Sequence, residues 1–228
     1  MLICIIGRTG SGKDYLAKKL EEKGLKQIKS YTTRPKRNEN EDTHTFITKE
    51  EADKITDKIA VTEINGYEYF ATYSQVKEND IYIIDPNGLK VLTENLKDEK
   101  MIVVYVKADD EERKERAINR ADNKEKELEI FNKRNESENE QFTEFENLLN
   151  RAGVSKLKRI HDSYDFKIES RFTSILGLWA NIYLVQLDTE CLYPDYTLDL
   201  MDSLYLYRNT YLEEDCNQVV KTLLGEIE

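Results

Sequence analysis

Short runs of consecutive apolar residues punctuate the first half of the chain and predict buried strands. The runs occupy residues 2–6, 81–85 and 101–106, and the second of them ends in an acid, Asp85. Strands that are apolar on both faces are typical of parallel sheets that helices cover on both sides. Helical patterns follow the first two runs, over residues 13–23 and 89–96. This alternation of strand and helix predicts an α/β protein with a central parallel sheet.

The stretch between the first two apolar runs predicts a smaller, β-rich unit. Residues 27–33 are polar but contain several β-prone side chains, and residues 43–48 predict another short strand. A short helix is expected over residues 49–56. Residues 59–72 then alternate around an Asn-Gly pair, the pattern of a hairpin.

The second half of the chain is predicted to be mainly helical. Residues 109–149 are highly charged and contain no Pro or Gly, while residues 164–168 predict a last core strand. From residue 173 onward three helices are expected, the first over 173–187. The other two carry apolar stripes, formed by Leu200, Leu204, Tyr207 and Tyr211 and by Val220, Leu223, Leu224 and Ile227. Such stripes could pack on the core of the protein, form a homodimer contact or bind a partner.

The charge of the chain narrows the classes of partner. The 228 residues include 34 Lys and Arg against 45 Asp and Glu, a formal charge of −11. Duplex nucleic acid and anionic membranes both require a basic face, so neither is an expected partner. Residues 188–228 hold ten acidic and two basic side chains, so the acidity belongs mainly to this tail.

Cysteine and histidine usage argues against a disulfide framework and against a His-based metal centre. Cys4, Cys191 and Cys216 are odd in number and lack CxxC spacing, and the only histidines are His44 and His161. A reduced, cytoplasmic setting is therefore expected. The longest apolar stretch, residues 175–187, is shorter than the roughly 20 residues that span a bilayer. The first residues also lack the basic leader of a signal peptide.

A glycine-rich segment connects the first strand to the first helix. It has the sequence GRTGSGKD and fits the phosphate-loop pattern GxxxxGK. Glycines allow the backbone to form a nest of N–H donors around a phosphate, and the helix N-terminus adds partial positive charge. The expected nucleotide-binding residues are Gly7, Arg8, Thr9, Gly10, Ser11, Gly12, Lys13 and Asp14, with Lys13 reaching the β- and γ-phosphates. The competing interpretation is a glycine-rich turn with no ligand.

The last position of this loop departs from the usual pattern. A Ser or Thr whose hydroxyl binds Mg²⁺ is expected there, and the chain has Asp14. A carboxylate can also hold Mg²⁺, directly or through water. Asp14 is therefore a candidate metal ligand, and the departure concerns metal binding more than phosphate binding.

A basic segment follows the first helix. Residues 24–38 contain no acidic side chain, although the chain as a whole is acidic. Arg34 and Arg37 lie three residues apart around a proline, and two guanidinium forks in this arrangement can clamp a phosphate. A solvated basic loop is the alternative explanation.

The segment SYTTRPKRNENEDTHTF, residues 30–46, resembles the guanylate kinases and their phage-type deoxynucleotide kinase relatives. The resemblance extends over about residues 1–170, and its specific parts are the phosphate loop, this segment, the DPNG turn and the NKR run. It implies that Arg34 and Arg37 bind the acceptor phosphate and that Ser30 lines the base or phosphate pocket. His44 falls where the family has a phosphate-binding Tyr, and a structural polar His is equally compatible with that position.

The resemblance continues through the predicted hairpin. It implies that Glu63 reads the guanine edge and that Tyr69 touches the acceptor phosphate. Ala71 falls where the family has a base-reading hydroxyl, with Thr72 beside it. This departure weakens the expectation of strict guanine selectivity, because a polar group discriminates between bases only where it is present. Asp85 closes the second buried strand and is expected to face the ligand crevice, toward Mg²⁺ or the acceptor, unless it only initiates the turn.

The charged helical segment resembles the family's lid. Arg116 and Arg120 lie one helical turn apart, and Arg134 follows in the NKR run. The resemblance implies that such arginines cover the transferring phosphoryl group, whose transition state spreads negative charge over its oxygens. A surface helix with salt bridges is the alternative. Arg120 and Arg134 are the stronger candidates.

These observations predict an α/β P-loop kinase fold of the nucleoside monophosphate (NMP) kinase type. Residues 1–187 would form the kinase domain, with an NMP-binding subdomain at about 30–78 and a lid at about 109–140. Residues 188–228 would form an acidic helical extension. The expected reaction moves the γ-phosphoryl group of ATP to (d)GMP or another (d)NMP with Mg²⁺, using Lys13, Arg34, Arg120 and Arg134. An inactive guanylate-kinase-like binding module and a P-loop kinase of a non-nucleotide phosphate are the alternatives.

Overall fold

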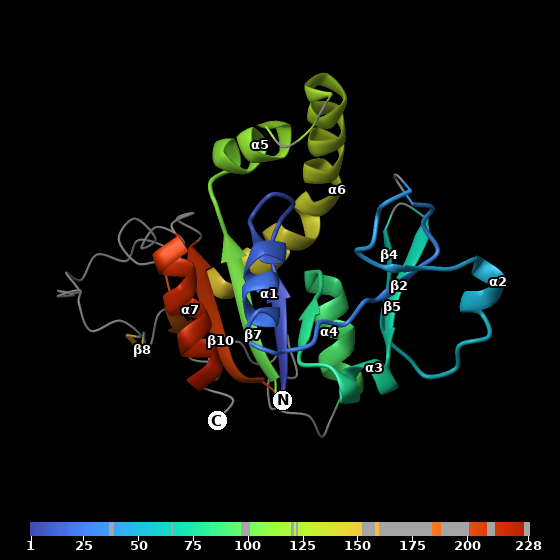
Figure 1. The fold of residues 1–228 in the computed structure, drawn as a ribbon, viewed down its shortest axis with the longest axis horizontal. Coiled ribbons are helices and arrows are strands. Elements are labelled where there is room, and N and C mark those ends of the chain that lie inside the picture. Colours follow the sequence, from blue (N-terminus) through green and yellow to red (C-terminus); the bar gives the residue numbers. More distant parts are fainter. Residues whose placement is uncertain are drawn as a thin grey trace.

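The computed structural model describes residues 1–36, 39–64, 66–96, 101–119, 121, 123–151, 158–159, 184–187, 201–208 and 213–225. Two sheets organise these residues: a six-stranded sheet that forms the core and a four-stranded sheet beside it (Figure 1).

The three apolar runs form neighbouring parallel strands of the main sheet, as predicted. The spatial order is β6-β1-β7-β10-β9-β8. The strands are β1 (Leu2–Ile6), β6 (Ile81–Ile83), β7 (Met101–Lys107), β8 (Lys158–Arg159), β9 (Leu184–Leu187) and β10 (Met201–Arg208). The first strand pairs in parallel with both β6 and β7, and every residue of β1 is buried. This burial on both faces explains the unbroken apolar sequence.

The expected helix through Leu200, Leu204, Tyr207 and Tyr211 is wrong, because residues 201–208 form strand β10. This strand pairs in parallel with β7, with Leu204 opposite Val103 and Leu206 opposite Tyr105. Its LYLY run is apolar and rich in aromatic residues, and a short run of this kind does not distinguish a helix from a buried strand. The structure also gives no domain boundary between residues 187 and 188, because β10 lies after that position and belongs to the core sheet.

The expected helix over residues 173–187 is also wrong at its C-terminal end. Residues 184–187 form β9, which pairs antiparallel with β10. The rest of that helix, and the strand expected at residues 164–168, lie outside the described residues.

Helices cover both faces of the main sheet. On one face lie α1 (Lys13–Glu21) and α7 (Glu213–Gly225), which bury Leu16, Leu20, Val219 and Leu223 against β1 and β7. The apolar stripe of α7 is thus used within the chain, since Val220 and Leu223 are buried in this core. A homodimer contact through this stripe was one of the alternatives drawn from the sequence, and the structure gives it no support.

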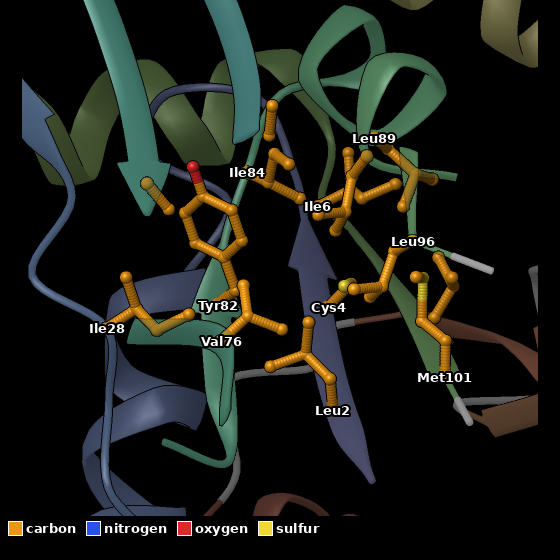
Figure 2. Close-up of a cluster of buried hydrophobic side chains, with 14 of the residues drawn as sticks. Leu2, Cys4, Ile6, Ile28, Val76, Tyr82, Ile84, Leu89, Leu96 and Met101 are labelled. Carbon is orange, nitrogen blue, oxygen red and sulfur yellow. The ribbon is translucent and has the colours of Figure 1, made fainter. Parts of the chain in front are cut away.

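The other face packs against α4 (Pro86–Asn95), the C-terminal half of α6 (Lys124–Arg151) and part of the small sheet. Figure 2 shows this cluster, in which Leu2, Cys4 and Ile6 of β1 meet Leu89 and Leu96. Cys4 and Cys216 are buried free thiols, and Cys191 lies outside the described residues. Among the described helices, none is long and apolar enough to cross a membrane.

The smaller sheet has the strand order β3-β2-β5-β4. It contains the predicted hairpin, β4 (Lys58–Ile64) and β5 (Tyr67–Thr72), together with β2 (Tyr31–Thr32) and β3 (Thr45–Phe46). Helices α2 (Lys49–Ala52) and α3 (Tyr73–Glu78) begin at Thr48 and Thr72, each of which forms a capping box. The unit lies within the residues 30–78 expected to form a subdomain, on the β6 and α4 side of the core (Figure 1).

The charged segment forms two helices, α5 (Asp110–Asn119) and α6. They stand at the same end of the main sheet as the loop that leads into α1 (Figure 1). The C-terminal ends of β1, β6 and β7 all lie at this end, because the three strands are parallel. Ligands of open α/β sheets bind in the crevice at this end.

Candidate active site

The glycine-rich loop between β1 and α1 has the order of strand, loop and helix that phosphate binding requires. Gly10 and Gly12 have φ angles of +81° and +93°, and Gly12 is the N-cap of α1. The first-turn N–H groups of a helix have no acceptor within the helix, so they point toward the loop with partial positive charge. The loop and the start of α1 together provide a nest of donors for an anion.

Lys13 and Asp14 are the first two residues of α1. The Lys13 side chain is half-buried, and its ammonium has no hydrogen bond or ion pair to any described residue. Asp14 is exposed beside it. The structure thus leaves a cation and a carboxylate side by side at the mouth of the phosphate loop.

Helices α5 and α6 both contact the loop at Thr9. Arg113 of α5 donates from Nη1 to the Thr9 carbonyl at 2.8 Å. Glu138 of α6 accepts from the Thr9 N–H at 2.9 Å and from its hydroxyl at 2.5 Å. Arg113 also donates to Asn135 of α6 at 2.9 Å, so the two helices and the loop share one hydrogen-bond network.

A cavity of about 200 Å³ lies beside the loop, at the end of β7. Arg8, Lys107 and Glu146 line it, and the Glu146 carboxylate accepts from the Tyr105 hydroxyl at 2.5 Å. Burial, followed by the negative charge of Glu146, raises the pKa of Tyr105 well above its ordinary value. Arg8 also stacks over the Phe142 ring at 5.1 Å, which ties α6 to the loop a second time.

Arg134 lies on α6 one helical turn before Glu138. Residues four apart share a face of a helix, and Glu138 touches Thr9, so Arg134 is on the face of α6 that is turned toward the loop. Its guanidinium has no hydrogen bond or ion pair to any described residue. Arg116 is exposed on α5, and Arg120 lies outside the described residues.

The predicted acceptor residue Arg34 is at the centre of a polar cluster on the small sheet. Its Nε donates to the Tyr69 hydroxyl at 3.1 Å, and its two terminal nitrogens donate to Glu41 at 3.3 and 2.7 Å. The guanidinium also lies over the Phe46 ring at 5.2 Å. Burial disfavours the charged guanidinium, but the hydrogen bonds and charge of Glu41 outweigh burial, so the pKa of Arg34 is raised. Arg37 lies outside the described residues.

Ser30 and His44 join the same cluster. The Ser30 hydroxyl and His44 Nδ1 are 2.9 Å apart and share a hydrogen bond. The His44 ring packs edge-on against Tyr69 and Phe46, with ring centroids 5.6 and 6.1 Å away. The structure therefore brings together Ser30, Arg34, His44 and Tyr69, four residues that the sequence proposed for the acceptor.

Two other proposed acceptor residues do not join this cluster. Glu63 pairs with Glu68 across the hairpin, while Thr62 pairs with Tyr69. Because neighbouring residues of a strand face opposite ways, Glu63 is on the face away from Tyr69, and it is exposed. The Thr72 hydroxyl accepts from the Gln75 N–H at 3.2 Å, so this side chain caps α3.

Asp85 has a structural role, which was the alternative to ligand binding in the interpretation of the sequence. It is the N-cap of α4, and Oδ1 accepts from the Gly88 N–H at 3.0 Å while Oδ2 accepts from the Thr62 hydroxyl at 3.3 Å. Burial raises the pKa of Asp85, and these hydrogen bonds oppose that shift. Both carboxylate oxygens are occupied by protein donors, so Asp85 is placed to cap a helix and to join the small sheet to the core.

Asp85→Asn and Asp85→Ala separate capping from ligand binding. Asn is as good an N-cap as Asp, whereas Ala is expected to cost about 1 kcal/mol of the free energy of unfolding. A raised carboxyl pKa stabilises the fold at pH values below the unfolded pKa, and this contribution is lost as the pH rises through the folded pKa. Urea unfolding should therefore show Asp85→Asn at least as stable as the wild type at pH 7, but with no advantage below about pH 4.

Nucleotide binding supplies the second readout for Asp85. A stable Asp85→Asn protein that loses ADP binding would contradict a purely structural role. A pH-independent difference between Asp85→Asn and the wild type would contradict the raised pKa.

Arg113, Glu138 and Glu41 are functional candidates that sequence reasoning missed. Arg113 lies on α5, where acids and bases are mixed, and Glu138 lies in a stretch of α6 where Glu recurs every few residues. Glu41 belongs to the short acidic run between the basic segment and Phe46, which was the only signal for it. None of the three has a local pattern that identifies its partner.

Of the comparisons with known proteins, the match to a family model covers the phosphate loop. A family model described as an AAA domain matches residues 3–142. No curated protein matches the chain. Among solved structures, the crystal structure of guanylate kinase from Anaplasma phagocytophilum is similar at 18% sequence identity and a TM-score of 0.41, with 60% of this chain and 86% of that chain covered. The family model spans more than half of the sequence, including the phosphate loop, α5 and most of α6, and the chain therefore belongs to the AAA domain family of P-loop NTPases.

Proposed function

We propose that the protein is a nucleoside monophosphate kinase that transfers the γ-phosphoryl group of ATP to (d)GMP or another (d)NMP. The supporting observation is a second candidate for an anion site, separate from the phosphate loop. Arg34, with Tyr69 and His44, forms an oriented guanidinium cluster on the small sheet, whereas Lys13 and the loop amides belong to the core. A transferase that moves phosphate between two phosphorylated substrates requires two such sites.

The acceptor phosphate is assigned to Arg34. Four of its five N–H donors are engaged, by Tyr69, Glu41 and the Pro35 carbonyl. A phosphate would use the remaining donor on Nη2 and would compete with the Glu41 carboxylate for the others, because both present the same arrangement of oxygens to the fork. Arg37, from the same motif, is proposed as the second phosphate ligand.

The base pocket is assigned to the opposite side of the same cluster. Ser30 and His44 supply a hydroxyl and an imidazole within one hydrogen-bonded pair. Glu63 faces away, and position 71 is alanine, so two groups that would read guanine are absent from this face. The family resemblance makes GMP and dGMP the first candidates for the acceptor, followed by the other deoxynucleoside monophosphates.

Mg²⁺ is proposed to accompany ATP. Mg²⁺ sites in kinases use one or two carboxylates together with phosphate oxygens and water. Asp14 fits this role because it is exposed and adjacent to Lys13, whereas both Asp85 oxygens already accept hydrogen bonds. The ion would neutralise charge on the β- and γ-phosphate oxygens.

The chain's own residues position the reacting groups rather than react with them. Lys13 and the loop amides hold the donor phosphates, and Arg34 holds the acceptor. Arg134, on the loop-facing side of α6, stabilises the charge that spreads over the phosphoryl oxygens, together with Arg120 of the resembled motif. The lid helices exclude water, which prevents hydrolysis of ATP.

An ADP-release assay with every ribo- and deoxynucleoside monophosphate tests the proposed reaction. We expect turnover with at least one acceptor, and faster turnover with GMP or dGMP than with the pyrimidine nucleotides. ADP binding without turnover of any NMP would overturn the NMP-kinase proposal and favour a binding module or another phosphorylated acceptor.

Arg34→Lys tests the acceptor assignment within the same assay. Lysine keeps the positive charge beside Glu41 but lacks the guanidinium fork, so we expect the acceptor KM to rise about 10-fold. ADP affinity should stay within about 2-fold, because Arg34 is assigned to the acceptor alone. A loss of ADP affinity with an unchanged acceptor KM would contradict the assignment, because Arg34 would then bind the donor nucleotide rather than the acceptor.

A further inference from the structure

Thr9 is held on all its polar groups by the two lid helices. Its carbonyl accepts from Arg113 of α5, and its N–H and hydroxyl both donate to Glu138 of α6. The residue is only 8% exposed. A single loop residue is therefore fixed from two sides by side chains that are far away in the sequence.

Arg113 is itself held in one orientation. Its side chain is 1% exposed, and its Nη2 donates to Asp110 and Asn135 at 2.8 and 2.9 Å. The guanidinium also lies over the Phe131 ring at 5.6 Å. A buried cation with partners on both lid helices and on the loop can change its orientation only if those helices move.

We propose that Arg113 and Glu138 are positioning residues for phosphoryl transfer, which lock the lid and the phosphate loop together through Thr9. The inference rests on the proposed kinase function. Arg134 lies one turn from Glu138, so anchoring Glu138 to Thr9 fixes the height of Arg134 above the loop. The catalytic arginine then reaches the transferring group only when the Thr9 contacts are formed.

A rival explanation is that Glu138 occupies a phosphate position and competes with the nucleotide. The geometry favours positioning. Glu138 uses the side-chain hydroxyl of Thr9 as well as its N–H, and it has no hydrogen bond to the described loop residues from Gly10 to Asp14. The donors at the start of α1 are therefore left for phosphate. The two explanations predict opposite changes in nucleotide affinity.

Steady-state kinetics of Glu138→Gln, Thr9→Val and the double variant test the lock. Each single variant removes part of the same contact, so we expect kcat per ADP-binding site to fall about 10-fold in each, with both KM values within about 3-fold. The double variant should also fall about 10-fold rather than 100-fold, because interacting residues are not additive. Thr9→Ser keeps the hydroxyl that donates to Glu138, so its kcat should exceed that of Thr9→Val.

Two results would overturn the positioning role. The first is a multiplicative, 100-fold loss in the double variant, which would make Thr9 and Glu138 independent. The second is a rise in ADP affinity of 10-fold or more in Glu138→Gln, which would make Glu138 a competitor. Glu136→Gln is the matched control, since Glu136 is an exposed residue of the same helix and the same charge is removed.

Hydrogen exchange separates this inference from the proposed reaction, because it requires only ADP. In the wild type, ADP should slow exchange both in the loop and in α6. In Glu138→Gln it should slow exchange in the loop alone, and equal protection of α6 in both proteins would overturn the lock. If no NMP is turned over, the kinase proposal fails while this comparison still decides the lock, and an absence of ADP binding would overturn both.

Discussion

Lys13→Ala is expected to reduce phosphoryl transfer by at least about 100-fold while leaving the fold intact. The ammonium has no hydrogen bond or ion pair to the described residues, so its removal orphans no charge in that part of the structure. Alanine is also the best helix former at the start of α1. The loss falls on the transition state, because a preorganised cation on the transferring phosphoryl group contributes a factor of about 10² to 10³.

The same ADP-release assay and a thermal melt measure the two halves of this expectation. Lys18→Ala is the matched control, because Lys18 is an exposed lysine of the same helix. Its activity should stay within about 2-fold of the wild type. Retention of more than about one tenth of wild-type activity by Lys13→Ala would remove Lys13 from the donor site, and a large fall in Tm would show that its role is structural.

The central sheet could be predicted because its information is local. The residues that form β1 and β6, and all but the last residue of β7, are apolar, and this pattern is typical of strands buried on both faces. Strand β10 could not be distinguished in this way. Residues 201–208 include aromatic and polar side chains that also suit an amphipathic helix, and the open edge of β7 decides the outcome.

The candidate site divides along the same line. The phosphate loop is contiguous, so the sequence names its residues directly. The sequence also identified four members of the Arg34 cluster, because each lies in a motif of the resembled family. They are Ser30, Arg34, His44 and Tyr69. The strand face on which Glu63 lies could not be predicted, because it depends on the register of the hairpin, and a shift of one residue reverses it.

The contacts between lid and loop could not be predicted at all. Thr9 and Glu138 are separated by 129 positions, and Thr9 and Arg113 by 104. Helices α5 and α6 contain so many charged residues that composition does not single out the two that meet Thr9. Only the packing of the lid on the end of the sheet selects them.

Gly10→Ala is expected to destabilise the protein through both its backbone conformation and its packing. The backbone there has φ +81°, which costs a residue with a Cβ about 1–2 kcal/mol. The added Cβ would also lie 2.7 Å from the Arg113 carbonyl oxygen, a backbone atom that moves only with α5. Overpacking of this kind costs about 1–3 kcal/mol, so we expect a loss of about 3 kcal/mol in the free energy of unfolding.

Gly24→Ala isolates the packing part of that loss. Gly24 has φ +97°, but an added Cβ there would meet no atom within 4 Å. Urea unfolding should therefore show only the backbone cost of about 1–2 kcal/mol for Gly24→Ala, and ADP affinity should be unchanged. In Gly10→Ala the clash forces α5 away from the loop and displaces Arg113 from Thr9, so ADP affinity and turnover should fall together with stability. If the two variants lost the same free energy of unfolding, α5 would have moved away from the added methyl group without a further loss of stability. The close contact of Gly10 with Arg113 would then not hold the lid on the phosphate loop.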